Sequence, residues 1–274
     1  MINLNFKDLQ LQYEGYTNTQ QLWQPNQSIL GLKQINLEPT TVKTYSTNIT
    51  HQLRLGKLVE RFVSETLKQQ TNINILAENV QIQDNKTTIG EIDCIITQNN
   101  IPIHLEIIYK FYLYLDTNNG DEIDKWIGPN KNDNLRKKLT KLKDKQLPLI
   151  YNKHSDKLIK KLGLNTHLIK QHVYFKAQLF TPYQEEKNIT FNNINKACLS
   201  GFYVAINKIE TLKLCKFYIP SKLNWLKAVS TNINWITFDV FKATVTEITN
   251  NKTAPLCWVK YPNGVLNKFF VVWW

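Results

Sequence analysis

Residues 89–113, IGEIDCIITQNNIPIHLEIIYKFYL, constrain the fold more than any other part of the chain. Two apolar runs flank QNN, which is typical of a tight hairpin turn. Side chains along a strand point alternately to its two faces. Glu106 and Lys110 therefore share one face of the later strand. The segment predicts an antiparallel hairpin that can bring Asp93 beside Glu106, with Lys110 within reach.

Acidic side chains on such strands need an explanation, because a buried carboxylate costs free energy unless a cation meets it. A partner lysine, a metal ion or a water-exposed cleft would each supply one. Carboxylates from two neighbouring strands, together with a lysine, suit Mg²⁺ or Mn²⁺, and such an ion could activate water against a phosphodiester. The alternative is an ion pair of the two acids with Lys110 and no catalysis. His104 shares the acid face but has no second histidine at ligand spacing, so we expect a structural role for it.

The segments around the hairpin predict a mixed α/β order. An apolar stripe at helical spacing runs through THQLRLGKLVERFVSETLKQQ, and the period then changes to that of strands. A basic helix follows, which Pro148 should end. The predicted elements are a helix over 50–70, strands over 73–83, 88–97 and 101–113, helices over 133–146 and 157–162, and a strand over 172–180.

Positive charge is concentrated in one segment of the chain. Residues 131–161 contain eleven Lys or Arg and three Asp, so they hold most of the net charge of +12. A local surplus of this kind suggests a polyanionic partner, either nucleic acid or an acidic membrane surface. A solvated lysine-rich helix is the alternative. The abundance of Asn and Lys also fits an AT-rich genome.

The C-terminal part changes character after about residue 181. Short apolar and aromatic runs predict strands within 201–209, 212–220, 234–248, 255–261 and 268–274, and YPNGV predicts a hairpin turn. Residues 1–50 are polar and weakly periodic. We therefore divide the chain into an N-terminal arm (1–50), an α/β core (51–180) and a β-rich region (181–274).

Cellular location is inferred from what the sequence does not contain. Four scattered cysteines show no C-x-x-C spacing, which argues against a zinc site or a disulfide framework and fits a reducing compartment. The N-terminal residues lack a basic region followed by an apolar stretch, so we expect no signal peptide. The apolar run FFVVWW is too short to span a bilayer. A cytoplasmic protein without a membrane partner is expected.

Several motifs resemble known proteins. A helix with GKLVE, a strand with GEID and a strand with HLEIIYK resemble the core of the PD-(D/E)XK nuclease superfamily. GEIDCII, HLEIIYKFYL, WIGPNKNDNLRKKL and KDKQLPL resemble, more narrowly, the bacterial domain-of-unknown-function 1853 family, which is grouped with that superfamily. The likeness implies a restriction-endonuclease-like αβββαβ core with a mixed central sheet, followed by a β-rich C-terminal extension.

The resemblance also implies roles for particular residues, with Mg²⁺ or Mn²⁺ as the cofactor. The superfamily usually carries Glu-x-Lys, whereas here Ile108 stands at that lysine position and Lys110 follows two residues later on the same face. The implied roles are metal binding by Asp93, Glu106 and the carbonyl of Ile107, catalysis by Lys110, and completion of the metal's water shell by Glu60. The expected substrate contacts are Glu91, where many relatives also place an acid, and Asn134, Arg136, Lys137, Lys138, Lys141 and Gln146.

These features favour a metal-dependent nuclease acting on DNA or RNA. One rival is a nuclease-fold protein that binds nucleic acid, or serves as a scaffold, without turnover; the displaced lysine favours it. A second rival is a carbohydrate or nucleotide-sugar binder that uses C-terminal tryptophans as a stacking platform, although tryptophans in a β-rich region are more often core. The sequence does not set the oligomeric state.

Overall fold

The computed structural model describes residues 6–38, 44–46, 53–116, 120–185 and 189–274. These residues form a mixed α/β protein with a large mixed sheet, organised as two compact units. The first unit contains residues 21–109 and 137–176, and the second contains 6–20, 110–136 and 177–274. None of the described helices combines the length and the apolar composition that a membrane crossing requires.

The first unit follows the predicted order of helix, three strands, helices and strand. Strands β5 and β7 begin in this unit and end in the second, and helix α3 begins in the second unit and ends here. Its elements are β1 (Ser28–Ile29), β2 (Leu32–Lys33), α2 (Leu55–Lys68), β3 (Ile73–Asp84), β4 (Thr87–Gln98), β5 (Ile101–Tyr114), α3 (Leu135–Lys141), η2 (Leu142–Gln146), η3 (Leu147–Tyr151), η4 (Lys153–Ser155), α4 (Asp156–Lys161), η5 (Thr166–Leu168) and β7 (Lys170–Pro182).

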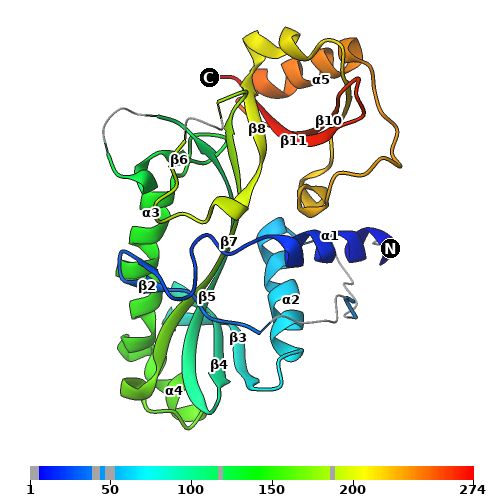
Figure 1. Ribbon diagram of the computed structural model, residues 1–274. Coiled ribbons are helices and arrows are strands. Elements are labelled where there is room, and N and C mark those ends of the chain that lie inside the picture. Colours follow the sequence, from blue (N-terminus) through cyan, green and yellow to red (C-terminus); the bar gives the residue numbers. More distant parts are fainter. Residues whose placement is uncertain (1–5, 39–43, 47–52, 117–119, 186–188) are drawn as a thin grey trace. The chain divides into compact units, whose positions relative to one another are not determined.

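The predicted hairpins are confirmed. Strands β3, β4 and β5 pair antiparallel in chain order, and β7 lies next to β5 in the sheet (Figure 1). The turn between β4 and β5 is made by Asn99 and Asn100, both with positive φ. That conformation defines the tight turn whose twist matches the twist of the flanking strands, and asparagine tolerates it well. The turn therefore sets the register of β5 against β4.

Helix α2 covers part of the sheet through its apolar stripe. Leu58, Val59, Phe62 and Val63 are buried, and the helix packs against β3. On another part of the sheet, Ile92 and Ile95 of β4 join a buried cluster with Ile82, Leu149, Ile150, Ile159 and Ile169. Apolar packing on both sides of Asp93 in the sequence, at Ile92 and Ile95, therefore fixes the part of β4 that carries this acid.

The basic helix differs from the single helix predicted over 133–146. The α-helix spans only Leu135–Lys141, Leu142–Gln146 continue as a π-helical turn, and Leu147–Tyr151 continue as a 3₁₀ helix. Pro148 does not end the helical path, because it lies in the first turn of η3, where its missing N–H is not needed. A π-turn widens the helix and changes the direction in which the following side chains project.

The second unit combines β-strands with helices, and its last two elements are strands. Its elements, besides the shared ones, are α1 (Phe6–Asn18), η1 (Glu122–Asp124), β6 (Trp126–Ile127), η7 (Lys196–Cys198), β8 (Leu199–Ala205), η8 (Ile206–Leu212), β9 (Lys216–Tyr218), η9 (Lys222–Leu226), α5 (Phe238–Asn250), β10 (Leu256–Lys260) and β11 (Leu266–Val272).

Parallel and antiparallel pairs are mixed in this unit. Strand β8 pairs parallel with β7 and with β11, and β10 pairs antiparallel with β11 and with β9. Strand β6 pairs antiparallel with the end of β5. The predicted turn in YPNGV joins β10 to β11 and places Gly264 at φ 84°. The apolar core of the unit includes Phe217, Phe269 and Val271.

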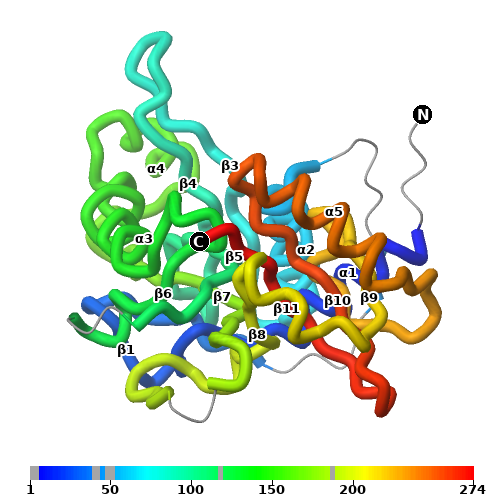
Figure 2. The backbone as a smooth tube through the Cα atoms, turned by 90° about the horizontal axis from the view of Figure 1, so that it is seen from above, coloured from blue at the N-terminus to red at the C-terminus, as the bar shows by residue number. Residues whose placement is uncertain are grey.

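Helix α5 corrects the prediction of a strand within 234–248. Phe238, Phe241, Val245 and Ile248 recur at three- and four-residue spacing, and Phe241 and Val245 are fully buried against β9 and β11. The β-branched residues of this segment had favoured a strand, but tertiary packing of the helical stripe decides the structure. Figure 2 shows α5 in orange beside β10 and β11 in red. The C-terminal part is therefore mixed α/β.

The polar N-terminal segment contains a helix rather than only irregular chain. Gly15 of α1 allows close packing, since a Cβ at this position would lie 1.9 Å from the carbonyl oxygen of Leu226. Residues 1–5, 39–43 and 47–50 of the predicted arm lie outside the described residues, as do residues 51 and 52 of the predicted core. All four cysteines are buried and free.

Candidate active site

The two strand acids meet as the hairpin predicts. Cys94 of β4 pairs with Leu105 of β5, so the antiparallel register continues toward Asp93 and Glu106. The backbone N–H of Ile107 donates to Asp93 Oδ2 at 2.9 Å, which fixes the Asp93 carboxylate against β5. Glu106 is fully buried and Asp93 is partly buried.

Both oxygens of Glu106 are held by neighbouring side chains. His104 Nε2 lies 3.0 Å from Glu106 Oε1, and Gln146 Nε2 donates to Glu106 Oε2 at 2.5 Å. His104 is itself fully buried, and its Nδ1 has no hydrogen-bond partner among the described residues. His104 therefore has a structural role within the site, because its imidazole orients the Glu106 carboxylate. The sequence could have indicated this, since His104 and Glu106 lie on the same face of the strand.

The electrostatics of Asp93 follow from this crowding. Burial, and after it repulsion from Glu106, raise the pKa of Asp93 to about 7. The hydrogen bond from Ile107 and attraction to Lys138 act in the opposite direction. The pair thus carries more negative charge than its protein surroundings balance.

Lys138 reaches this pair from helix α3. Its Nζ donates to Gln146 Oε1 at 2.8 Å, and the same Gln146 side chain donates to Glu106. The π-turn that contains Gln146 therefore connects the basic helix to the acid pair. Both residues are predicted to contact substrate, and in the structure each also has a partner inside the site.

Glu60 and Glu91 form a second acidic group around Lys57 of α2. Lys57 Nζ donates to Glu60 at 2.8 Å, to Glu91 at 2.5 Å and to Asn79 at 3.0 Å. Burial raises the pKa of Glu60, and Glu60 in turn raises the pKa of Asp93. Lys57 was not singled out as a site residue, although its spacing of three residues from Glu60 allows a pair on one helix face.

Two predicted basic residues have acidic partners in the second unit. Lys110 Nζ donates to Asp133 Oδ2 at 2.6 Å. Arg136 donates to Asp121 at 2.7 Å and also bonds Asp124, which lowers the pKa of Asp124. These pairs stabilise the segment 121–136, and neither involves the acid pair.

The other residues predicted to contact substrate differ in their exposure to solvent. Lys137 and Lys141 are exposed on α3. Asn134 is partly buried and forms a bridge with Ile127 of β6. The helix therefore presents its cations in two ways, since Lys138 turns to the acid pair while Lys137 and Lys141 face solvent.

The C-terminal tryptophans do not form a single exposed platform. Trp225 and Trp258 are buried. The indole N–H of Trp235 donates to Thr231 O, and that of Trp274 donates to Pro129 O. The structure thus provides no exposed platform built from these four tryptophans.

The acid pair fits Mg²⁺ or Mn²⁺ only as a site completed largely by water. Among the described residues, no group of three or more His, Cys, Asp or Glu side chains could hold a metal ion. Mg²⁺ commonly takes one or two carboxylates and keeps several waters. Each oxygen of Glu106 accepts one hydrogen bond and retains a second lone pair. Asp93, Glu106 and the predicted carbonyl of Ile107 can therefore supply the protein ligands.

Comparison with known proteins adds one finding. A family model described as "Domain of unknown function (DUF1853)" matches residues 9–271, nearly the whole chain. No curated protein and no solved structure matches this chain. The site must therefore be interpreted from its own chemistry.

Proposed function

Since this chain belongs to the DUF1853 family, whose description names no activity, we propose a function from the acid pair: metal-dependent hydrolysis of phosphodiester bonds in DNA or RNA. The observation that carries the proposal is the convergence of Asp93 and Glu106, where burial and then repulsion from Glu106 raise the pKa of Asp93. A divalent cation is the partner that such a pair of carboxylates binds best.

The element order supports a nuclease-type fold for the first unit. Helix α2, strands β3, β4 and β5, helix α3 and strand β7 follow one another in the αβββαβ order of the PD-(D/E)XK core. The acids lie on the second and third of these strands. We propose that the unit is a member of this superfamily, with the predicted boundaries 51–180 as its approximate extent.

The chain's own residues would divide the work as follows. Asp93 and Glu106 bind the ion, and His104 and Gln146 hold the Glu106 carboxylate in one orientation. The Ile107 N–H does the same for Asp93. When bound, the divalent ion would lower the pKa of a water molecule and offset charge on the phosphate.

Lys138 is the cation we propose beside the reacting phosphate. It is joined to Glu106 through Gln146 and acts electrostatically on Asp93. A positive charge placed there can stabilise the charge that develops in the transition state. Lys110, the lysine that the family resemblance implies, has Asp133 as its carboxylate partner. Glu60, held by Lys57, remains the residue proposed to order the metal's water shell.

Nucleic acid is the proposed substrate because the basic helix adjoins the acid pair. Lys137 and Lys141 are exposed on the helix that carries Lys138. Exposed lysines on one helix can contact successive phosphates, and such contacts bind without sequence preference. Asn134 and Arg136 are proposed to support that surface indirectly, since their segment is ordered by the Asp121 and Asp124 contacts.

The test is cleavage of a supercoiled plasmid and of an end-labelled RNA, each with Mg²⁺, with Mn²⁺ and with a chelator. We expect metal-dependent cleavage of at least one substrate, reduced on the order of 1000-fold by Asp93→Asn or by Glu106→Gln. Asp144→Asn is the matched control, because Asp144 is an exposed acid on the same helical segment as Gln146. It should cleave like the wild type.

A nucleic-acid binder without turnover is the second candidate. The observation favouring it is that Glu106 already has a protein partner on each oxygen, so that its carboxylate is held in place by side chains alone. That candidate predicts no cleavage with either metal, and a DNA affinity that falls steeply with salt and is unchanged by Asp93→Asn. Cleavage that survives both acid substitutions would contradict the proposed site.

A further inference from the structure

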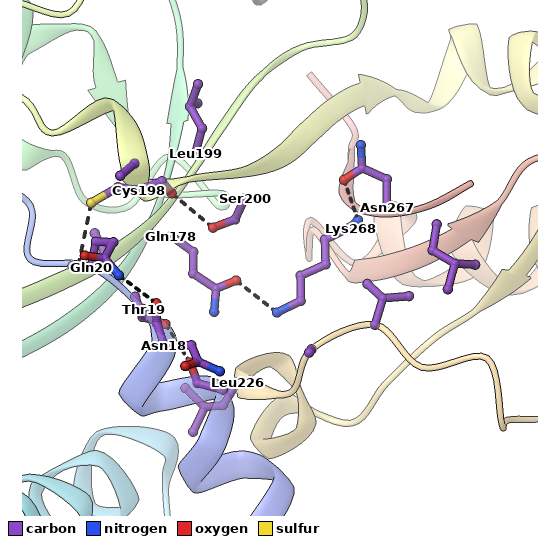
Figure 3. A pocket seen from close by; sticks show the side chains of 16 residues that line it. Asn18, Thr19, Gln20, Gln178, Cys198, Leu199, Ser200, Leu226, Asn267 and Lys268 are labelled. Atoms are coloured by element: carbon purple, nitrogen blue, oxygen red, sulfur yellow. Dashed lines mark hydrogen bonds between the residues drawn. The ribbon is translucent and has the colours of Figure 1, made fainter. Parts of the chain in front are cut away.

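A cavity of about 370 Å³ lies within the second unit, apart from the acid pair. Figure 3 shows its walls: the end of α1, the last part of β7, the start of β8, η9 and the start of β11. Amide and hydroxyl side chains alternate with small apolar ones around it. The polar lining residues are Asn18, Thr19, Gln20, Gln178, Ser200 and Asn267.

Lys268 of β11 is the one lysine or arginine that lines this cavity in the described part of the chain. Only 8% of its surface is exposed. Its Nζ donates to Gln178 Oε1 at 3.1 Å and to the carbonyl oxygen of Trp225 at 3.0 Å. Both acceptors are neutral. No described carboxylate forms an ion pair with Lys268, whereas the nearby buried Lys227 is paired with Asp8 at 2.5 Å.

The described residues that are strand partners of Lys268 or accept its hydrogen bonds are all uncharged. Its partner in β8 is Gly201, and its partner in β10 is Trp258. Strand β7 contributes Gln178, and η9 contributes Trp225. The other ionisable side chain of the lining is Cys198, whose thiol donates to the carbonyl oxygen of Gln20. Burial without an acid lowers the pKa of Lys268 to about 7.

An ammonium group has three N–H donors. Two of those of Lys268 bond Gln178 and Trp225, which leaves one donor and the positive charge without a partner among the described residues. Burying an unpaired cation is costly. The cavity provides the space in which a negatively charged group could meet that donor. Its volume lies at the lower end of the range for small-molecule sites.

We propose that this cavity binds a small polar molecule with one carboxylate or phosphate group, and that the anion pairs with Lys268. The amide and hydroxyl side chains of the lining would bond the rest of the ligand. This site is independent of the proposed nuclease activity, because it uses other residues in the other unit. Binding would draw Lys268 into its charged form, so each ligand should be accompanied by uptake of a fraction of a proton at pH 7.

The experiment is calorimetric titration of the full chain with acetate, glycolate and inorganic phosphate. We expect dissociation constants on the order of 1–10 mM or tighter for at least one of them. The carboxylates keep their charge above pH 6, so their binding should weaken by up to about tenfold per pH unit above 7 as Lys268 loses its proton. Titrations in two buffers of different ionisation enthalpy measure the proton taken up.

Two variants separate a ligand site from a structural lysine. Lys268→Met should abolish binding, while Lys216→Met, which removes an exposed lysine on β9, should leave it unchanged. Ser200→Leu keeps Lys268 but fills the cavity, so it should also abolish binding if Lys268→Met fails to fold. No binding by any of the three anions, or binding unchanged in Ser200→Leu, would overturn the proposal and leave Lys268 as a buried structural lysine.

Discussion

Asp93 in the first unit and Lys268 in the second are buried ionisable groups of opposite sign. Burial raises the pKa of Asp93 to about 7 and lowers the pKa of Lys268 to about 7. The same desolvation therefore acts on both, but the two sites differ in what relieves it. Asp93 lies beside a second acid, so we propose a cation for its site, whereas Lys268 has only neutral acceptors, so we propose an anion.

The pH windows of the two groups meet near neutrality. Between pH 3.8 and about 7 the unfolded chain has released the Asp93 proton and the folded chain retains it, so stability falls as pH rises. Between about pH 7 and 10.5 the unfolded chain holds the Lys268 proton and the folded chain does not, so stability rises with pH. Both costs are therefore near their maximum at pH 7, where ligands for the two sites would stabilise the protein most.

The largest expected effect is that of Lys268 on the pH dependence of the unfolding free energy. Relative to wild type, Lys268→Met should lose the gain in unfolding free energy above pH 7, up to about 1.4 kcal/mol per pH unit. Chemical unfolding at several values between pH 7 and 9.5 measures this slope. The absolute stability of the variant also includes the cost of leaving Gln178 and Trp225 without their donor, so the slope is the informative quantity. A slope equal to that of wild type would show that Lys268 is charged when buried.

The acid pair should show the opposite slope and a response to metal. Asp93→Asn should remove the fall in stability between about pH 4 and 7, again up to about 1.4 kcal/mol per unit, with Asp144→Asn as the unchanged control. Mg²⁺ at about 100 times its dissociation constant should stabilise wild type by about 2.7 kcal/mol and the variant much less. Thermal unfolding with and without Mg²⁺ tests this. Equal stabilisation of both proteins would place the ion elsewhere.

The sequence predicts those features of the two sites that depend on residues close together in the chain, and it does not predict those that depend on distant residues. The meeting of Asp93 and Glu106 followed from strand alternation and a short asparagine turn, which are local rules. The contact of Gln146 with Glu106 did not follow, because the π-turn breaks the helical phase on which the prediction relied. Lys268 lies in an apolar strand run that was recognised as a strand, but its burial depends on α1 and η9, which are distant in sequence.

The same contrast between local and non-local interactions explains which parts of the fold were predicted wrongly. Strands β3, β4 and β5 pair with their neighbours in chain order, so their pattern was sufficient. Helix α5 was predicted as a strand because Thr244, Val245 and Thr246 favour strands in isolation. Its stripe becomes visible only when Phe241 and Val245 are known to pack on β9 and β11. Non-local packing decided the structure where local preference was ambiguous.

Lys138 in the first unit and Lys110 in the second are the two candidates for the lysine that assists cleavage. Lys138 reaches the acid pair through Gln146 in the first unit, while Lys110 is paired with Asp133 in the second. Lys138→Met should lower the cleavage rate by about 100-fold, the effect of losing one charge-stabilising donor. Lys110→Met should lower it far less, and Lys143→Met, an exposed lysine of the same helical segment, should not change it. The reverse order for Lys138 and Lys110 would restore the lysine implied by the family resemblance.

The smallest expected effect is that of Lys57 on the unfolding free energy. It tests whether burial distinguishes Asp93 and Lys268 from an exposed charged group. Lys57 has three partners, Glu60, Glu91 and Asn79, but its side chain is about half exposed. Exposed ion pairs contribute about 0–1 kcal/mol because water and salt screen them. Lys57→Met should therefore change the unfolding free energy by less than about 1 kcal/mol, and raising the salt concentration should reduce even that difference. A change as large as that caused by Asp93→Asn would mean that the Glu60 group is electrically part of the acid pair, and that Lys57 already supplies some of the positive charge that we assign to the metal.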